Sequence, residues 1–261
     1  MTQTLADATT PTGDQLVIAD GWRQGRGAFG GLTIAALIRA IEARVADPAR
    51  RVRSVTAELP APAVPGVAQV EVEILRSGSS LTCARAALRQ DGTVASHIVA
   101  ILAASRPLEA PLAWNELVPP PAPPWQEVTA HAAAPRWPEF AQHFEYRPVA
   151  GAPLAGGAAC AVGWVRSRTP GAARDAAYLA ALVDAWWPAA LIRATAMRPL
   201  ATIAYTLDIV GDAAAGDPDA PLLYRGTVPV CGDGYFLETR ELWSADGRLL
   251  ALNHQTFAII R

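Results

Sequence analysis

Cysteine is scarce in this chain, and its few cysteines form no pattern typical of metal ligands or of a disulfide framework. Cys83, Cys160 and Cys231 lie far apart in a chain of 261 residues. Their number is odd and no closely spaced pair occurs, so the sequence predicts neither a disulfide scaffold nor a zinc site. Buried, reduced thiols are the simplest interpretation. We expect no metal and no cofactor.

Long apolar runs and concentrated positive charge are also missing. Charged residues or proline interrupt every apolar stretch before it reaches the length of a membrane span, and no basic segment followed by an apolar one opens the chain. The net charge is −2 and no basic run is present, which argues against nucleic-acid binding. Half of the residues are apolar, which excludes a disordered chain. We therefore expect a folded cytoplasmic protein without a membrane span.

An internal repeat organises the sequence. The hexapeptide AALIRA at positions 35–40 recurs at 189–194, which is 189 − 35 = 154 residues later. After each copy come a strand-like run, a glycine-containing turn and two long strand patterns joined by an Asp-Gly pair. This shared order predicts one fold unit used twice. The same offset aligns Gly30 in the first half with Asp184 in the second, because 184 − 154 = 30.

The first half contains one helix followed by several strands. A glycine-rich segment leads into a helix expected at 32–45, in which apolar side chains recur at three- and four-residue spacing. Several residues of this helix are alanines, whose short side chains let other elements pack closely around it. Strands are expected at 52–59, 67–77, 81–89 and 93–105, the last two joined by an Asp-Gly turn. One helix with an antiparallel sheet is an α+β unit.

The second half follows a proline-rich segment at 107–138, where neither a sheet ladder nor a helix interior can form. We divide the chain into an N-terminal unit 1–106, this connector and a C-terminal unit 139–261. In the latter we expect the long helix at 185–194, with Pro188 in its first turn, after an apolar segment at 174–183 that can itself be helical. Its expected strands are 140–148, 159–167, 201–210, 222–230, 235–244 and 249–260.

Three stretches carry a resemblance to a known family: Phe29-Gly30-Gly31, the strand around 53–59, and the segment LRSGSS at 75–80 with its following hairpin. With these stretches the chain resembles the acyl-CoA thioesterases of the double hotdog fold, the thioesterase B-like (type II) group. The resemblance covers most of the chain except the N-terminal tail and the connector. It implies two tandem units, each a sheet wrapped around one long helix, and an acyl-CoA substrate.

The resemblance also implies a catalytic set. The family uses an Asp near the start of the second helix, a Thr or Ser on the following strand, and a Gln on the last strand. These positions correspond here to Asp184, Thr202 and Gln255. The neighbours of Gln255 at positions 254 and 256 depart from the family pattern, which makes this match the weakest of the three.

The chemistry of the three side chains fits thioester hydrolysis. Water attacks the carbonyl carbon and negative charge develops on the oxygen, so the site needs a base for the water and a donor for the oxyanion. Asp184 can accept a proton, while Thr202 and Gln255 offer both donors and acceptors. Backbone amides at a helix start can bind the oxyanion. By pseudo-symmetry Gly30 and Gly31, after Phe29, are our candidates for that role.

Each assignment has a plainer alternative. Asp184 ahead of a helix is an N-cap in many proteins, although it stands inside an apolar pattern here. The glycine pair can serve only a loop that needs small residues. Trp186 and Trp187 are interpreted as core or as the wall of an acyl pocket, which the sequence does not separate. His254 is a second candidate base. Four arginines are candidates for CoA phosphates or, more simply, surface charges: Arg23, Arg26, Arg51 and Arg53.

Two other functions remain open at this point. A non-catalytic acyl-binding hotdog protein would use Asp184 only as a cap. A hotdog hydratase would need an Asp–His pair in one motif, and neither His97 nor His254 has such a neighbour. A hotdog sheet exposes edges that pair with another copy, so we expect a homodimer or a larger homo-oligomer, with a role in fatty acid metabolism.

Overall fold

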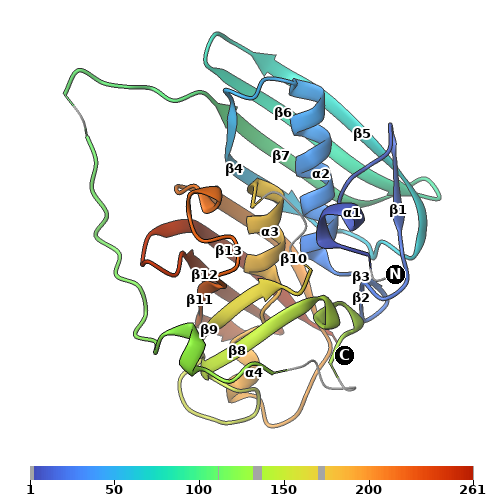
Figure 1. Cartoon of the computed structure of the whole chain (residues 1–261). Coiled ribbons are helices and arrows are strands. Elements are labelled where there is room, and N and C mark those ends of the chain that lie inside the picture. Colours follow the sequence, from blue (N-terminus) through green and yellow to red (C-terminus); the bar gives the residue numbers. More distant parts are fainter. Residues whose placement is uncertain (1–2, 111, 132–136, 170–173, 261) are drawn as a thin grey trace.

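A single large antiparallel sheet wraps around two helices in the computed structural model of the chain, which describes residues 3–110, 112–131, 137–169 and 174–260 (Figure 1). The helices are α1 (Leu5–Ala8), α2 (Gly30–Val45), α3 (Ala176–Asp184) and α4 (Ala190–Arg193), with short 3-10 turns η1 (Trp125–Glu127), η2 (Glu139–His143) and η3 (Ala213–Ala215). The strands are β1 (Gln15–Ile18), β2 (Arg23–Gln24), β3 (Gly27–Ala28), β4 (Arg51–Glu58), β5 (Gly66–Ser77), β6 (Leu81–Gln90), β7 (Thr93–Ala103), β8 (Phe144–Ala150), β9 (Cys160–Ser167), β10 (Leu200–Ile209), β11 (Leu222–Gly232), β12 (Tyr235–Trp243) and β13 (Leu249–Ile259).

The two halves share this sheet. Its order is β1-β5-β6-β7-β4-β10-β13-β12-β11-β9-β8, so β4 of the first half pairs with β10 of the second. In that antiparallel pair Val55 lies opposite Leu207 and Thr56 lies opposite Thr206. The α+β double hotdog architecture expected from the sequence is confirmed. No helix among the described residues is long and apolar enough to cross a membrane.

Alternating burial explains why these segments form strands. In β6 Thr82, Ala84, Ala86 and Leu88 are buried, while the residues between them are exposed or half-buried. This period of two places one face of the strand against the helices. The β6–β7 turn contains Asp91 and Gly92, both with positive φ angles of 48° and 77°, as a tight hairpin turn requires. The sequence-based strands agree with the structure to within a few residues at most ends.

Helices α2 and α3 lie side by side on the inner face of the sheet (Figure 1). They run antiparallel, because Gly31 at the start of α2 meets the end of α3 while Arg39 farther along α2 pairs with Asp175 at the start of α3. Small residues permit the close approach: a Cβ atom on Gly31 would lie 3.0 Å from the Cα of Ala181.

The long second helix expected at 185–194 is wrong, because the observed helix lies almost wholly in the preceding apolar segment 174–183. This helix spans Ala176–Asp184, begins at the N-cap Asp175 and ends where 185–194 was expected to begin a helix. The reason is Pro188, which disfavours helical geometry at the residue before it and removes an N–H donor. The repeated hexapeptide therefore lies inside α2 in the first half but around the four-residue α4 in the second. Its offset of 154 does not relate equivalent helix positions.

The connector contains no strand in its described part, although His131 makes an isolated β-bridge to Tyr146 of β8. It also contains η1, where the Trp125 ring packs under the guanidinium of Arg147 at 5.1 Å. Trp164 Nε1 donates to the carbonyl of Pro123 at 3.1 Å, so this end is attached to the second half. Trp114, by contrast, is 77% exposed. Residues 111 and 132–136 of the predicted connector lie outside the described residues.

The cysteines are less buried than the sequence suggested. Cys231 is exposed, and Cys83 and Cys160 are half-buried. All three are free thiols. The expectation of three buried thiols is therefore wrong, because Cys231 lies near the end of β11, where the last four residues are exposed.

The packing of Trp186 against β9 gives a test of the fold. Replacing Gly163 with alanine would place a Cβ atom inside van der Waals contact of the Trp186 ring and 2.7 Å from the Arg147 carbonyl oxygen. We expect a loss of about 1–3 kcal/mol in the free energy of unfolding, measured by urea denaturation. Gly232→Ala is the matched control, since a Cβ there meets no atom within 4 Å. Equal stability of the two variants would contradict this packing.

Candidate active site

Asp184 is the last residue of α3 and lies between the two helices. Its side chain is only 6% exposed. Oδ2 accepts a hydrogen bond of 2.8 Å from the backbone N–H of Gly31, and Oδ1 accepts one of 2.9 Å from Nε2 of Gln255. The family pattern led us to expect this residue near the start of the second helix. The structure places it at the opposite end, where it meets the start of α2 instead.

Gln255 connects the carboxylate to the sheet. It lies on β13 and is completely buried, opposite Tyr205 of β10 on one side and Glu238 of β12 on the other. Its Nε2 also donates to Oδ1 of Asn253 at 2.9 Å, and its Oε1 accepts from the hydroxyl of Thr202 at 3.1 Å. All three hydrogen-bonding partners of the side-chain amide are therefore consistent with one orientation of Gln255.

A β-bulge brings Thr202 to Gln255. In β10 the register against β13 shifts between Thr202 and Ala204, which leaves Ile203 as the extra residue. Tyr205 and Leu207 point into the core, so regular alternation would have turned Ile203 inward and Thr202 outward. Because of the bulge, Thr202 instead faces Gln255 at the start of β10, and Ile203 is exposed. The structure thus joins the three predicted residues in one chain of hydrogen bonds.

The two glycines at the start of α2 differ in the hydrogen bonding of their backbone N–H groups. The N–H of Gly31 is already bonded to Asp184. The N–H of Gly30 has no hydrogen-bond partner among the described residues. A Cβ on Gly30 would lie 3.2 Å from Oδ2 of Asp184 and 3.1 Å from Cδ2 of Leu59. The expectation that both amides are free is corrected, and only Gly30 is available as a donor.

The aromatic residues named from the sequence lie in the core. Phe29 is buried and stacks on Phe140, with ring centroids 4.2 Å apart. Trp186 is buried and stacks on Tyr224 at 5.1 Å, and Trp187 Nε1 donates to the carbonyl of Gly151 at 2.9 Å. These contacts hold the ends of the helices in place.

Two charged residues of the site were missed. Arg240 on β12 is fully buried and donates from Nη1 to the Val183 carbonyl at 3.0 Å and to Oδ1 of Asp184 at 3.3 Å. Its Nε donates to Glu238 at 3.0 Å. The signal was present in the sequence, because Glu238 and Arg240 share the parity of the apolar residues Phe236 and Leu242 on one strand.

Tyrosines complete the surroundings of the carboxylate. Tyr205 donates to the carbonyl of Ala180 at 3.2 Å, and Tyr146 donates to that of Ala185 at 3.0 Å. Burial, and to a lesser extent the charge of Asp184, raises the pKa of both hydroxyls well above the ordinary value. Burial likewise raises the pKa of Glu238, against the opposing effect of Arg240. The hydroxyls therefore remain donors at neutral pH.

The alternative candidates lie elsewhere. His254 is exposed on the outer face of the sheet, and its neighbours Asn253 and Gln255 face inward. His97 pairs with Glu58 at 3.1 Å at the surface. Of the four arginines, Arg23 pairs with Asp20, Arg51 pairs with Asp212, and Arg26 and Arg53 are exposed. Within the described ranges no group of three or more His, Cys, Asp and Glu side chains could hold a metal.

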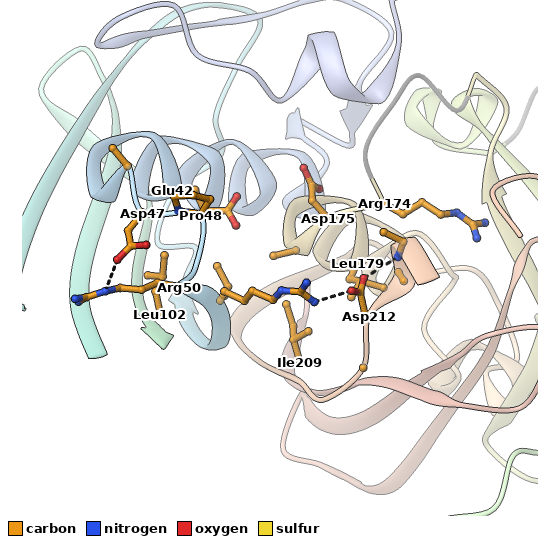
Figure 2. A pocket seen from close by; sticks show the side chains of 17 residues that line it. Glu42, Asp47, Pro48, Arg50, Leu102, Arg174, Asp175, Leu179, Ile209 and Asp212 are labelled. Atoms are coloured by element: carbon orange, nitrogen blue, oxygen red, sulfur yellow. Dashed lines mark hydrogen bonds and ion pairs between the residues drawn. The ribbon is translucent and has the colours of Figure 1, made fainter. Parts of the chain in front are cut away.

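A cavity of about 630 Å³ opens at the other end of the helix pair (Figure 2). It lies between the end of α2 and the start of α3, with an apolar floor that includes Val52, Leu102 and Leu179 and a charged rim that includes Glu42 and Asp175. None of the three predicted catalytic residues lines it. The hydrogen-bond chain around Asp184, rather than this cavity, therefore defines the candidate active site, because there a carboxylate at the end of one helix accepts from the start of the other, whereas Asp175 in the cavity wall caps its own helix.

Comparisons with known proteins agree with the fold. The acyl-CoA thioesterase N-terminal domain matches residues 18–105 and the acyl-CoA thioesterase C-terminal domain matches residues 115–259. The chain therefore belongs to the acyl-CoA thioesterase family. A comparison with curated protein sequences finds no match.

Solved structures show the same architecture. A hot dog fold protein of unknown function from Alicyclobacillus acidocaldarius is 25% identical, with a TM-score of 0.87 over 100% of this chain and 99% of that one. Acyl-CoA thioesterase II TesB2 of Mycobacterium marinum is 21% identical, with a TM-score of 0.71 over 89% of each chain. The TesB protein of Mycobacterium avium is 17% identical, with a TM-score of 0.75 over 95% and 94% of the two chains.

The cavity rim gives a pH-dependent prediction. Burial and the nearby charge of Asp175 raise the pKa of Glu42 from 4.5 to about 7, although Arg39 opposes this. Between these pH values Glu42 loses its proton in the unfolded chain but keeps it in the folded chain. The free energy of unfolding therefore falls as the pH rises from about 4.5 to 7. Glu42→Gln should remove this loss and stabilise the protein at pH 8 by at most about 3 kcal/mol.

Denaturation midpoints of wild type and Glu42→Gln at pH 4.5, 6 and 8 measure this effect. Glu73→Gln is the control, because it makes the same change at a surface glutamate that pairs with Arg85. A difference between Glu42→Gln and wild type that does not grow with pH would contradict the assignment.

Proposed function

We propose that this protein hydrolyses acyl-CoA thioesters to a free acid and CoA, with water activated by Asp184 and positioned by Thr202 and Gln255. The observation that supports it is the unbroken chain of hydrogen bonds from Thr202 through Gln255 to Asp184 and on to the start of α2. A carboxylate held beside a helix N-terminus combines a base with a donor for an oxyanion.

The reaction follows from the chemistry of these groups. Asp184 accepts a proton from water as the water oxygen forms a bond to the thioester carbon. The negative charge that develops on the carbonyl oxygen is stabilised by the N–H of Gly30 at the start of α2. The C–S bond then breaks, and Asp184 returns the proton to the leaving CoA thiolate. Thr202 orients the water, and Gln255 holds both side chains.

Replacing Asp184 with asparagine should remove the base while keeping the size of the side chain. We expect free CoA release from acyl-CoAs of different chain lengths to fall by about 10²–10⁴-fold. A thiol reagent measures the product. Asp208→Asn is the control, because it makes the same change at an exposed position of β10.

The outcomes separate the three functions. Full turnover by Asp184→Asn would show that the assigned residues are wrong. Binding of acyl-CoA without any release of CoA by the wild type would favour a non-catalytic acyl-binding protein. Hydration of an enoyl-CoA without thioester cleavage would identify a hydratase. Loss of activity in Asp184→Asn but not in Asp208→Asn supports hydrolysis. The same assay with other thioester carriers would define the carrier, and the acyl series would define chain-length preference.

We further propose that two or more copies of the chain associate. The edge strands β1 and β8 each have one side without a neighbouring strand in the sheet, and Val17 on β1 is 61% exposed. Light scattering should give at least twice the chain mass of 27.5 kDa, that is 2 × 27.5 = 55 kDa. A mass of one chain across the micromolar range would contradict self-association. A cytoplasmic location and a role in fatty acid metabolism remain predictions.

A further inference from the structure

A buried cation lies between two buried carboxylates behind the candidate active site. The Arg240 side chain is 1% exposed, and its guanidinium contacts Asp184 at 3.3 Å and Glu238 at 3.0 Å. The Glu238 side chain is completely buried. Charges that are this far from water need partners, because removal of one partner leaves an unpaired charge in the protein interior. The arrangement therefore couples the Asp184 carboxylate to Arg240 and Glu238, two residues that no substrate reaches.

The two oxygens of Asp184 are not equivalent. Oδ1 accepts from both Gln255 and Arg240, so its two lone pairs are occupied. Oδ2 accepts only from the N–H of Gly31, which leaves one lone pair. Space beside Oδ2 is kept open by Gly30, since a Cβ there would lie 3.2 Å from this oxygen. Only Oδ2 is therefore free to take a proton from water beside the Gly30 amide.

We propose that Arg240 is a positioning residue that holds the Asp184 carboxylate through Oδ1 and, together with Gln255, directs Oδ2 toward the reacting water. The inference deepens the proposed hydrolase function and rests on it. Arg240 itself does not touch the substrate, because it is buried behind Asp184. It acts through the side chain in front of it.

Glu238 fixes the orientation of Arg240. It accepts from Nε of Arg240, from the hydroxyl of Tyr224 at 3.1 Å and from the N–H of Ala189 at 3.1 Å. These donors come from β12, β11 and the segment just before α4. Glu238 also competes with Asp184 for the single positive charge. Its removal should therefore have the opposite electrostatic effect from removal of Arg240.

The other groups that face Asp184 cannot replace the guanidinium. These groups are the hydroxyls of Tyr146 on β8, Tyr205 on β10 and Tyr224 on β11, and the amide of Gln255 on β13. All are neutral at the pH of an assay, since burial raises the pKa of each tyrosine. Arg240 is thus the positive charge of this cluster, and its effect on pH dependence can be isolated.

The test compares Arg240→Gln, Arg240→Lys and Glu238→Gln with wild type in the full chain. For Arg240→Gln we expect kcat to fall about 10²-fold with little change in KM, and the acidic limb of the kcat/KM profile to move to higher pH. Arg240→Lys should restore most of kcat and return the limb toward that of the wild type. Glu238→Gln should move the limb to lower pH, because the guanidinium then serves Asp184 alone.

Arg225→Gln is the matched control. Arg225 lies on the neighbouring strand β11 and pairs with Glu241 at 2.6 Å on the outer side of the sheet. Its removal should leave kcat and the pH profile unchanged. If Arg240→Gln does not fold, the double variant Glu238→Gln with Arg240→Gln removes both charges together and should show a smaller shift in the same direction, because Arg240 contacts Asp184 directly and Glu238 does not. An unshifted acidic limb in a folded variant without Arg240 would overturn the proposal.

A second readout separates this proposal from the hydrolase function. In protein with ¹³C-labelled aspartate, one carboxyl resonance should be missing from Asp184→Asn. That resonance should titrate at higher pH in Arg240→Gln than in wild type, whether or not any thioester is cleaved. A wild type without thioesterase activity would overturn the proposed function alone. A resonance that titrates at the same pH in both proteins would overturn the role of Arg240.

Discussion

The hydrogen bond between the Gly31 amide and Asp184 is the interaction on which the site depends. A carboxylate at the end of a helix faces the negative end of the helix dipole and is unfavourable there. It is tolerated here because α2 begins at the same point, with its positive end and a free N–H. This requires α2 and α3 to run antiparallel at close range. Glycine and alanine at the crossing make that approach possible, so small residues in the core determine where a charge can be placed.

The pseudo-symmetry of the fold is not carried into the site. The Asp-Gly turns of the two hairpins are 246 − 91 = 155 residues apart, which places Ala100 at the position equivalent to Gln255 (255 − 155 = 100). The strand pairing agrees, since Ala100 lies opposite Val55 and Gln255 lies opposite Tyr205. The cavity in Figure 2 occupies the equivalent end of the helix pair, and its walls include Val52 and Leu102. The end of the helix pair at Asp184 is therefore polar and closed by hydrogen bonds, whereas the opposite end opens into the cavity with its apolar floor.

The sequence was sufficient for the sheet and insufficient for the helix ends. Strand alternation and the Asp-Gly turns are local signals, and they gave most strand positions. The start of α3 also has a local signal, the N-cap Asp175, but the repeated hexapeptide favoured a long helix at 185–194 instead. Asp184, Thr202 and Gln255 were found by resemblance. Their contacts depend on a bulge at Ile203 and on a helix crossing, and neither has a signature within a few residues of sequence.

The break after α3 then explains how the rest of the site is assembled. Had the helix continued through Pro188, the carbonyl of Val183 would have accepted from the N–H of Trp187, and the carbonyl of Ala185 from that of Ala189. Because the helix ends, Val183 accepts from Arg240, Ala185 accepts from Tyr146, and Ala189 donates to Glu238. Three backbone groups released by the break are therefore satisfied by side chains of the surrounding sheet. The proline therefore connects the end of a helix to the buried charges that hold the carboxylate in place.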